Sequence, residues 1–213
     1  MYKVTLKSDF EQPYDKYFTQ DGVEFQRISS GGPNKIQQFE KLRSLGYFVP
    51  QHGIVKELSS QFPTLVVYTD INQHEGKGKL LLPSTVATDL YPDNFCCEFI
   101  ECSQQITTSY KLLQIGKRQF IIRYSSDHEW MANQGRYAVD ILAESPLKQY
   151  IDAVPQPIWS IDYICDINKK DIPVAVDFNV SPKFNDLDLH FFISNQDIAH
   201  EVSDAINYYS TLS

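Results

Sequence analysis

The chain has 213 residues, of which 42% are hydrophobic and 22% are charged, and it carries a formal net charge of −8 at pH 7. These values are typical of a globular protein with one sizeable domain or two small lobes. The acidic balance argues against a nucleic-acid partner, which requires a basic face, and no apolar run approaches the roughly 20 residues that span a bilayer.

The first half of the chain predicts short strands around one helix. The helix follows the turn-rich segment SSGGPN, carries apolar residues on roughly one side and ends at Gly46, where an extended segment begins. β-Branched and aromatic residues predict the strands. We expect strands at 2–6, 23–28, 64–70 and 80–83, a helix from Asn34, and a short helix near 55–60.

The second half predicts a series of strands that closes with an amphipathic helix. A tight turn at Gly116-Lys117 joins two of the strands, and the pair Ser194 and Asp197 marks the start of the last helix. We expect strands at 95–102, 109–116, 118–126, 136–144, 159–166 and 174–180, and helices at 145–154 and 194–210. The sum is an α+β fold with mostly antiparallel strands flanked by helices.

The four cysteines and five histidines show no metal-binding spacing. The N-terminus lacks the apolar region of a signal peptide. We therefore expect reduced thiols in a cytoplasmic protein that has no membrane partner.

The last two strands carry polar residues on one face. Side chains alternate along a strand, so Asp177 and Asn179 project together, and Asp162 of the neighbouring strand lies across from them if the two strands pair. Carboxylates held close repel each other unless a cation lies between them. Two carboxylates and a carboxamide suit Mg²⁺, which keeps waters and takes oxygens from phosphates. A half-exposed strand end whose polar face meets water is the alternative.

The order of these and other residues along the chain resembles the ATP-grasp family. The resemblance extends from about Gly31 to the C-terminal helix. It rests on Asn34-Lys35 before the first helix, Gly46–Pro50 after it, the apolar segment Glu98–Glu101, Lys111, Arg123, Asn133 and Gly135, then Asp162, and Asp177-Phe178-Asn179-Val180-Ser181-Pro182 in place of the motif E-x-N-x-x-P.

The resemblance implies an ATP-grasp-like fold in which two α+β lobes clasp a nucleotide cleft, with ATP and Mg²⁺ as cofactors. Small lobes with a glycine-rich loop would occupy residues 1–95, and the lobe with the metal site would occupy 96–213. Backbone groups of the segment Glu98, Phe99, Ile100 and Glu101 would contact adenine. The metal would be held by Asp162, Asp177 and Asn179, where Asp177 replaces the usual glutamate with a side chain shorter by one methylene.

Basic residues are implied around the phosphates. Lys111, where arginine is usual, and Arg123 and Asn133 would lie near the transferred phosphate as the catalytic groups, and Lys35 is a further nucleotide-binding residue. Tyr68 stands about where a phosphate-binding lysine is expected. Lys77 and Lys79, on either side of Gly78, either replace that lysine or form a solvated hairpin tip.

The implied activity is an ATP- and Mg²⁺-dependent ligase that activates a carboxylate as an acyl-phosphate for attack by an amine or thiol. Its substrates would be small molecules or peptides. The alternative is a nucleotide-binding or structural protein that kept the fold and lost the reaction, which Tyr68 favours. Only about thirty residues precede Asn34, too few for the N-terminal domain usual in the family; a minimal ligase, a homodimer that completes the site and a degenerate relative each fit this length.

Overall fold

The computed structural model describes residues 2–7, 12–20, 23–29, 33–73, 77–102, 106–132, 134–154, 156, 158–166, 168, 172–179, 182 and 192–211. Within these ranges the fold is α+β with mostly antiparallel sheets and few helices, as the sequence predicts. No helix in the described part of the chain is long and apolar enough to cross a membrane.

The chain divides into two compact units. Unit 1 comprises Met1–Gly32, Ser103–Tyr163 and Asp177–Ser213, and unit 2 comprises Pro33–Cys102 and Ile164–Val176. This division is discontinuous along the chain. The predicted separation into lobes at residues 1–95 and 96–213 stays a prediction.

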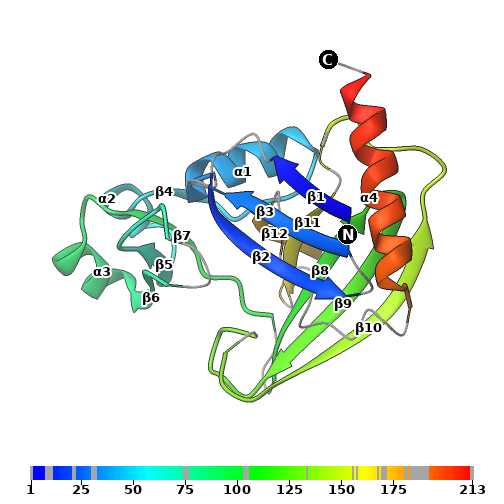
Figure 1. The fold of residues 1–213 in the computed structure, drawn as a ribbon. Helices are drawn as coiled ribbons and strands as arrows, with labels where there is room; N and C mark the ends of the chain where they lie inside the picture. Colours follow the sequence, from blue (N-terminus) through cyan, green and yellow to red (C-terminus); the bar gives the residue numbers. More distant parts are fainter. Residues whose placement is uncertain are drawn as a thin grey trace. The chain divides into compact units, whose positions relative to one another are not determined.

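Unit 1 contains a sheet of five strands in the order β10-β9-β8-β11-β12 (Figure 1). Its strands are β8 (Thr107–Ile115), β9 (Arg118–Ser126), β10 (Tyr137–Pro146), β11 (Ile158–Asp166) and β12 (Ile172–Asn179), of which the last residues of β11 and the first of β12 belong to unit 2. The pairs β10–β9, β9–β8 and β8–β11 are antiparallel.

The C-terminal helix α4 (Asn195–Ser210) covers one face of this sheet, as the amphipathic pattern predicts (Figure 1). The core beneath it is made entirely of aliphatic and aromatic side chains: Leu113, Ile115, Phe120, Ile122, Ile158, Ile193, Ile198 and Val202. Burial of this apolar surface, worth about 25 cal/mol per Å², is the main force that holds α4 in place.

A separate sheet of three strands is formed by the N-terminal residues. It contains β1 (Tyr2–Lys7), β2 (Gln12–Gln20) and β3 (Val23–Ser29) in the order β1-β3-β2. Strands β1 and β3 are parallel, whereas β2 is antiparallel to β3. Strands β1 and β3 are predicted from the sequence, and β2 is not, because its polar composition lacks a clear strand pattern.

Unit 2 contains a sheet of four strands in the order β4-β7-β5-β6. Its elements are α1 (Lys35–Ser44), β4 (His52–Ile54), α2 (Val55–Leu58), β5 (Thr64–Tyr68), β6 (Lys79–Pro83), α3 (Ser84–Leu90) and β7 (Phe95–Glu98). The core between this sheet and its two short helices is formed by Val55, Leu58, Leu65, Val67, Ala87 and Cys96. Neither β4 nor α3 is predicted from the sequence.

Helix α1 forms where the sequence predicts it because its N-terminus is capped. The Asn34 side chain accepts a hydrogen bond from the Gln37 amide at 3.0 Å, and the Gln37 side chain accepts one from the Asn34 amide at 2.9 Å. Phe39 and Leu42 are fully buried. Gly46, with φ of +85°, follows the end of the helix as expected.

The predicted helix at 145–154 is wrong. Strand β10 continues to Pro146, and the following residues are irregular. Contacts to α4 fix them: the Tyr150 ring stacks on Tyr208 with centroids 4.6 Å apart, and the Tyr208 hydroxyl donates to Asp152 at 2.7 Å. These tertiary contacts override the local helical preference.

The turn between β8 and β9 is fixed by α4, and this predicts an unequal effect of two glycine substitutions. Gly116 has φ of +55°, and a Cβ there would lie 2.5 Å from Glu201 Oε2 and 2.7 Å from the Glu201 carbonyl oxygen. A left-handed alanine alone costs about 1 kcal/mol. We expect Gly116→Ala to lower the free energy of unfolding in urea by more than about 2 kcal/mol, since α4 must also shift.

The matched control is Gly46→Ala, because Gly46 also has a positive φ but no atom beyond its chain neighbours lies within 4 Å of the position that a Cβ would take. It should lose only the backbone contribution of about 1 kcal/mol. Equal losses for the two variants would show that the contact with Glu201 does not constrain the turn.

Candidate functional site

Lys111 and Asp162 form an ion pair between the central strand of the five-stranded sheet, β8, and its neighbour β11. They are directly opposite each other in the register of β8 and β11, and Lys111 Nζ lies 3.1 Å from Asp162 Oδ1. Their side chains are only 14% and 27% exposed. The pair lies on the same face of the sheet as Leu113 and Ile122, so the apolar face covered by α4 continues into a polar patch.

Asp177 and Asn179, near the end of β12, project from this same face. Phe178, between them, contacts the Trp159 ring with centroids 6.5 Å apart, and Trp159 lies on the face of β11 opposite to Asp162. Asn179 Nδ2 donates to Asp177 Oδ2 at 3.2 Å. We call Lys111, Asp162, Asp177 and Asn179 the β8–β11–β12 cluster.

The ammonium of Lys111 keeps its charge in this cluster. Burial lowers the pKa of Lys111, but Asp162, Tyr124 and Asp177 together raise it by more, and the net shift is upward. Lys111 Nζ also lies 5.8 Å from the centroid of the Tyr124 ring. Tyr124 is not among the predicted site residues, although the register of the β8–β9 hairpin would place it on the same face, two pairs beyond Lys111 and Ile122.

The donor set of the cluster fits an open magnesium site. Asp162, Asp177 and Asn179 offer hard oxygen atoms from two adjacent strands, and Mg²⁺ completes such a set with waters and phosphate oxygens. The described ranges contain no group of three or more His, Cys, Asp or Glu residues that could hold a metal ion.

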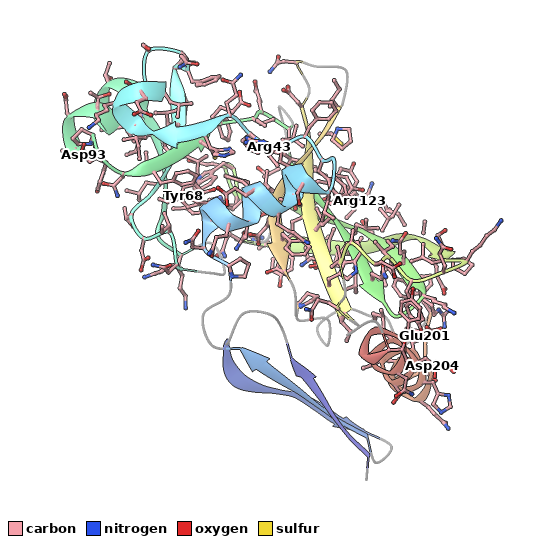
Figure 2. All side chains as sticks on the ribbon, turned by 90° about the horizontal axis from the view of Figure 1, so that it is seen from above. Arg43, Tyr68, Asp93, Arg123, Glu201 and Asp204 are labelled. Carbon is pink, nitrogen blue, oxygen red and sulfur yellow. The ribbon has the colours of Figure 1, made fainter. Side chains whose placement is uncertain are left out.

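Arg123 is not brought to the cluster. It pairs with Tyr110 in the register of β8 and β9, which places it on the opposite face from Lys111. Its guanidinium, labelled in Figure 2, donates to Asp140 on β10 at 3.2 Å from Nε and 2.8 Å from Nη2. The predicted catalytic residue Asn133 lies outside the described residues.

In unit 2 two lysines converge on Tyr68 at the end of β5 (labelled in Figure 2). Lys79 is the cross-strand partner of Tyr68, and its Nζ lies 5.7 Å from the centroid of the tyrosine ring. Lys35 Nζ lies 5.9 Å from the same centroid. Two ammonium groups therefore lie over the ring of Tyr68, the residue that stands about where the resemblance implies a lysine.

Lys35 is almost completely buried at the start of α1. Its Nζ donates to Gln38 Oε1 at 2.7 Å and to the Val176 carbonyl oxygen at 3.2 Å. Lys77 is exposed, beside Gly78 with φ of +67° in the turn before β6. The structure therefore brings Lys35 and Lys79 together and leaves Lys77 at the surface.

The predicted adenine-binding segment begins at the end of β7. The Glu98 amide donates to the Gln51 carbonyl at 2.9 Å, and Glu98 Oε1 accepts from the Gln51 amide at 3.0 Å, so the Glu98 side chain has a structural role. Phe99 is half-buried, Ile100 is buried and Glu101 is exposed. Cys97 is buried, and its Sγ lies 3.8 Å from the Tyr68 hydroxyl oxygen.

No protein-family model matches the sequence, and no curated protein matches it either. Solved structures of ATP-grasp proteins do match. The macrocyclase MdnC from Microcystis aeruginosa, bound with the precursor peptide MdnA, has a TM-score of 0.51 and 12% identity over 82% of this chain and 61% of that protein. A RiPP-associated ATP-grasp ligase from Chryseobacterium gregarium, in complex with ADP and a leader and core peptide, has a TM-score of 0.52 and 10% identity over 80% and 58%.

The D-alanine–D-alanine ligase from Bacillus anthracis has a TM-score of 0.52 and 12% identity, over 84% of this chain and 69% of that protein. The chain thus spans about three fifths of the length of MdnC and of the Chryseobacterium ligase. At these identities the likeness establishes the fold, and the chain has the ATP-grasp fold.

Two cross-strand ion pairs of unit 1 differ in burial and predict unequal effects of the same substitution. Asp162→Ala leaves the Lys111 ammonium in a mostly buried position without this carboxylate, and we expect it to lower the free energy of unfolding by about 3 kcal/mol. Asp140→Ala breaks the Arg123 pair, whose side chains are 42% and 49% exposed, and should lower the free energy of unfolding far less than Asp162→Ala does. Urea unfolding measures both, and a loss at Asp140 as large as that at Asp162 would contradict the assignment.

The cysteines of β7 predict a pattern of chemical labelling. Burial raises the pKa of Cys96 to about 12 and that of Cys97 to about 11, so both thiols stay protonated at pH 8. We expect iodoacetamide to modify the partly exposed Cys102 in the folded protein and to leave Cys96 and Cys97 unmodified. Peptide mass spectrometry reads the pattern, urea-unfolded protein is the positive control, and modification of Cys97 in the folded protein would contradict it.

Proposed function

We propose that this chain is an ATP- and Mg²⁺-dependent ligase that activates a carboxylate as an acyl-phosphate for attack by an amine or a thiol. The observation that carries the proposal is the β8–β11–β12 cluster, in a chain with the ATP-grasp fold. Phosphoryl transfer needs positioned charge rather than a covalent nucleophile, and the cluster provides charge of both signs on one sheet face.

Each residue of the cluster has a proposed role. Asp162, Asp177 and Asn179 would hold the Mg²⁺, which neutralises charge on the phosphate oxygens when it is bound. Lys111 would bind an oxygen of the transferred phosphate, since its ammonium is a compact donor on a flexible stem. Arg123 has no part in this proposal, because it lies on the other face of the sheet and pairs with Asp140.

In unit 2 we propose that Lys35 and Lys79 bind phosphate oxygens of the nucleotide and that the backbone of residues 98–101 contacts the base. The supporting observation is the convergence of two ammonium groups on the Tyr68 ring. An aromatic ring orients ammonium groups by cation–π attraction and leaves their N–H groups able to donate to phosphate oxygens. Tyr68 therefore does not by itself argue against nucleotide binding.

For the substrate we propose an amino-acid or peptide carboxylate with an amine acceptor. The support comes from the proteins with similar folds, two of which are described in complex with precursor, leader or core peptides and one as a D-alanine–D-alanine ligase. We further propose that the protein acts in the cytoplasm, where the free state of its four cysteines is maintained.

We expect Mg²⁺-dependent nucleotide binding that two separate substitutions weaken. Titration calorimetry with ATP and Mg²⁺ should show binding by the wild type, and Asp177→Ala and Lys79→Met should each weaken it at least tenfold. Lys56→Met is the matched control for the lysine, because Lys56 forms an exposed ion pair with Asp93. It should bind as the wild type does.

No binding by the wild type at millimolar nucleotide would overturn the proposal. Release of ADP in the presence of amino acids or peptides then tests turnover. Binding without ADP release for any substrate tried would favour the second candidate, a nucleotide-binding protein that has lost the reaction, which the tyrosine at position 68 in place of lysine favours.

A further inference from the structure

We infer that Lys111 is an internal counter-ion that keeps a free divalent cation out of the β8–β11–β12 cluster, so that the cluster accepts a metal only together with a phosphate-bearing ligand. The inference rests on the proposed function for the nature of that ligand. It concerns selectivity: the site would discriminate a metal–phosphate complex from the metal alone.

The geometry places the Lys111 ammonium among the oxygen atoms that a metal would use. Lys111 Nζ lies 3.1 Å from Asp162 Oδ1, and it interacts electrostatically with Asp177 on the next strand. A cation that binds both carboxylates must share this space with the ammonium. Like charges in a mostly buried position repel strongly, because the local dielectric is lower than that of water.

The charges of the cluster also decide what can bind. Two carboxylates and one ammonium leave a single excess negative charge, to which the neutral Asn179 amide adds none. A divalent cation alone would reverse the sign of the cluster, with two cationic groups side by side. A phosphate group that arrives with the metal brings negative charge of its own, and its oxygens give the displaced ammonium a new partner.

The surroundings keep Lys111 in place until such a ligand arrives. The Tyr124 ring lies 5.8 Å from Nζ, and the Lys111 side chain is only 14% exposed. A largely exposed lysine would turn into water and leave the carboxylates open to a metal, and the low exposure of the Lys111 side chain opposes that movement.

The test is the amount of Mn²⁺ that the protein retains in equilibrium dialysis, with and without inorganic tripolyphosphate, because tripolyphosphate itself complexes the free ion. Wild-type protein should bind Mn²⁺ alone only weakly, and tripolyphosphate should strengthen the binding at least tenfold. Lys111→Met should bind Mn²⁺ alone at least tenfold more tightly than the wild type, and tripolyphosphate should give it much less added affinity.

Lys56→Met, at the exposed pair with Asp93, is the matched control and should behave as the wild type. Lys111→Gln, which keeps a hydrogen-bond donor without the charge, replaces Lys111→Met if that variant does not fold, and the same tightening is expected. Equal Mn²⁺ affinity of the wild type and the Lys111 variant that folds, without tripolyphosphate and including no binding by either of them, would overturn the inference. Because that arm contains no nucleotide, its result is separate from the calorimetric test of ATP binding.

Discussion

The ion pair between Lys111 and Asp162 lies where the apolar part of one sheet face meets its polar part. It joins β8 and β11, which have β9 and β10 on one side of them in the sheet and β12 on the other. On one side along β8 come Leu113 and Ile115, which α4 covers. An ion pair at this boundary can be mostly buried without being sealed, which is what a binding site for charged ligands requires.

The ammonium groups of Lys111 in unit 1 and Lys35 in unit 2 are held by different kinds of partner. In unit 1 a carboxylate directly opposite Lys111 holds the charge in position. In unit 2 the Lys35 ammonium is oriented by an amide oxygen, a carbonyl oxygen and the faces of aromatic rings. Dipoles and ring quadrupoles direct an ammonium group without opposing it by a full negative charge. An incoming anion must therefore compete with the Asp162 carboxylate for Lys111, whereas at Lys35 it competes with these neutral groups.

Strand alternation was enough to predict much of the cluster. It places Asp177 and Asn179 on one face, and the hairpin places Asp162 near them, as the structure has it. The position of Arg123 could also have been obtained from the sequence. A two-residue turn at Gly116-Lys117 sets Lys111 opposite Ile122, and Arg123 must then face the other way. The helix predicted at 145–154 is wrong, because that segment is held by the stacking of Tyr150 on Tyr208, two residues far apart in the chain. The contacts of Lys35 and Lys79 with the Tyr68 ring also join residues from separate parts of the chain, so no local sequence pattern predicts them.

The dependence of the β8–β9 turn on α4 has a consequence for how the chain acquires its structure during synthesis. The Lys117 amide donates to Glu201 Oε2 at 2.9 Å, and the two residues are 84 positions apart. A ribosome that adds about 5–20 residues per second needs several seconds to make the intervening chain. For that time the β8–β9 hairpin has its apolar face uncovered, since Ile198 and Val202 have not yet been made. Contacts of such long sequence separation also form slowly, so the nascent chain passes through a stage in which it is vulnerable to aggregation and suited to chaperone binding.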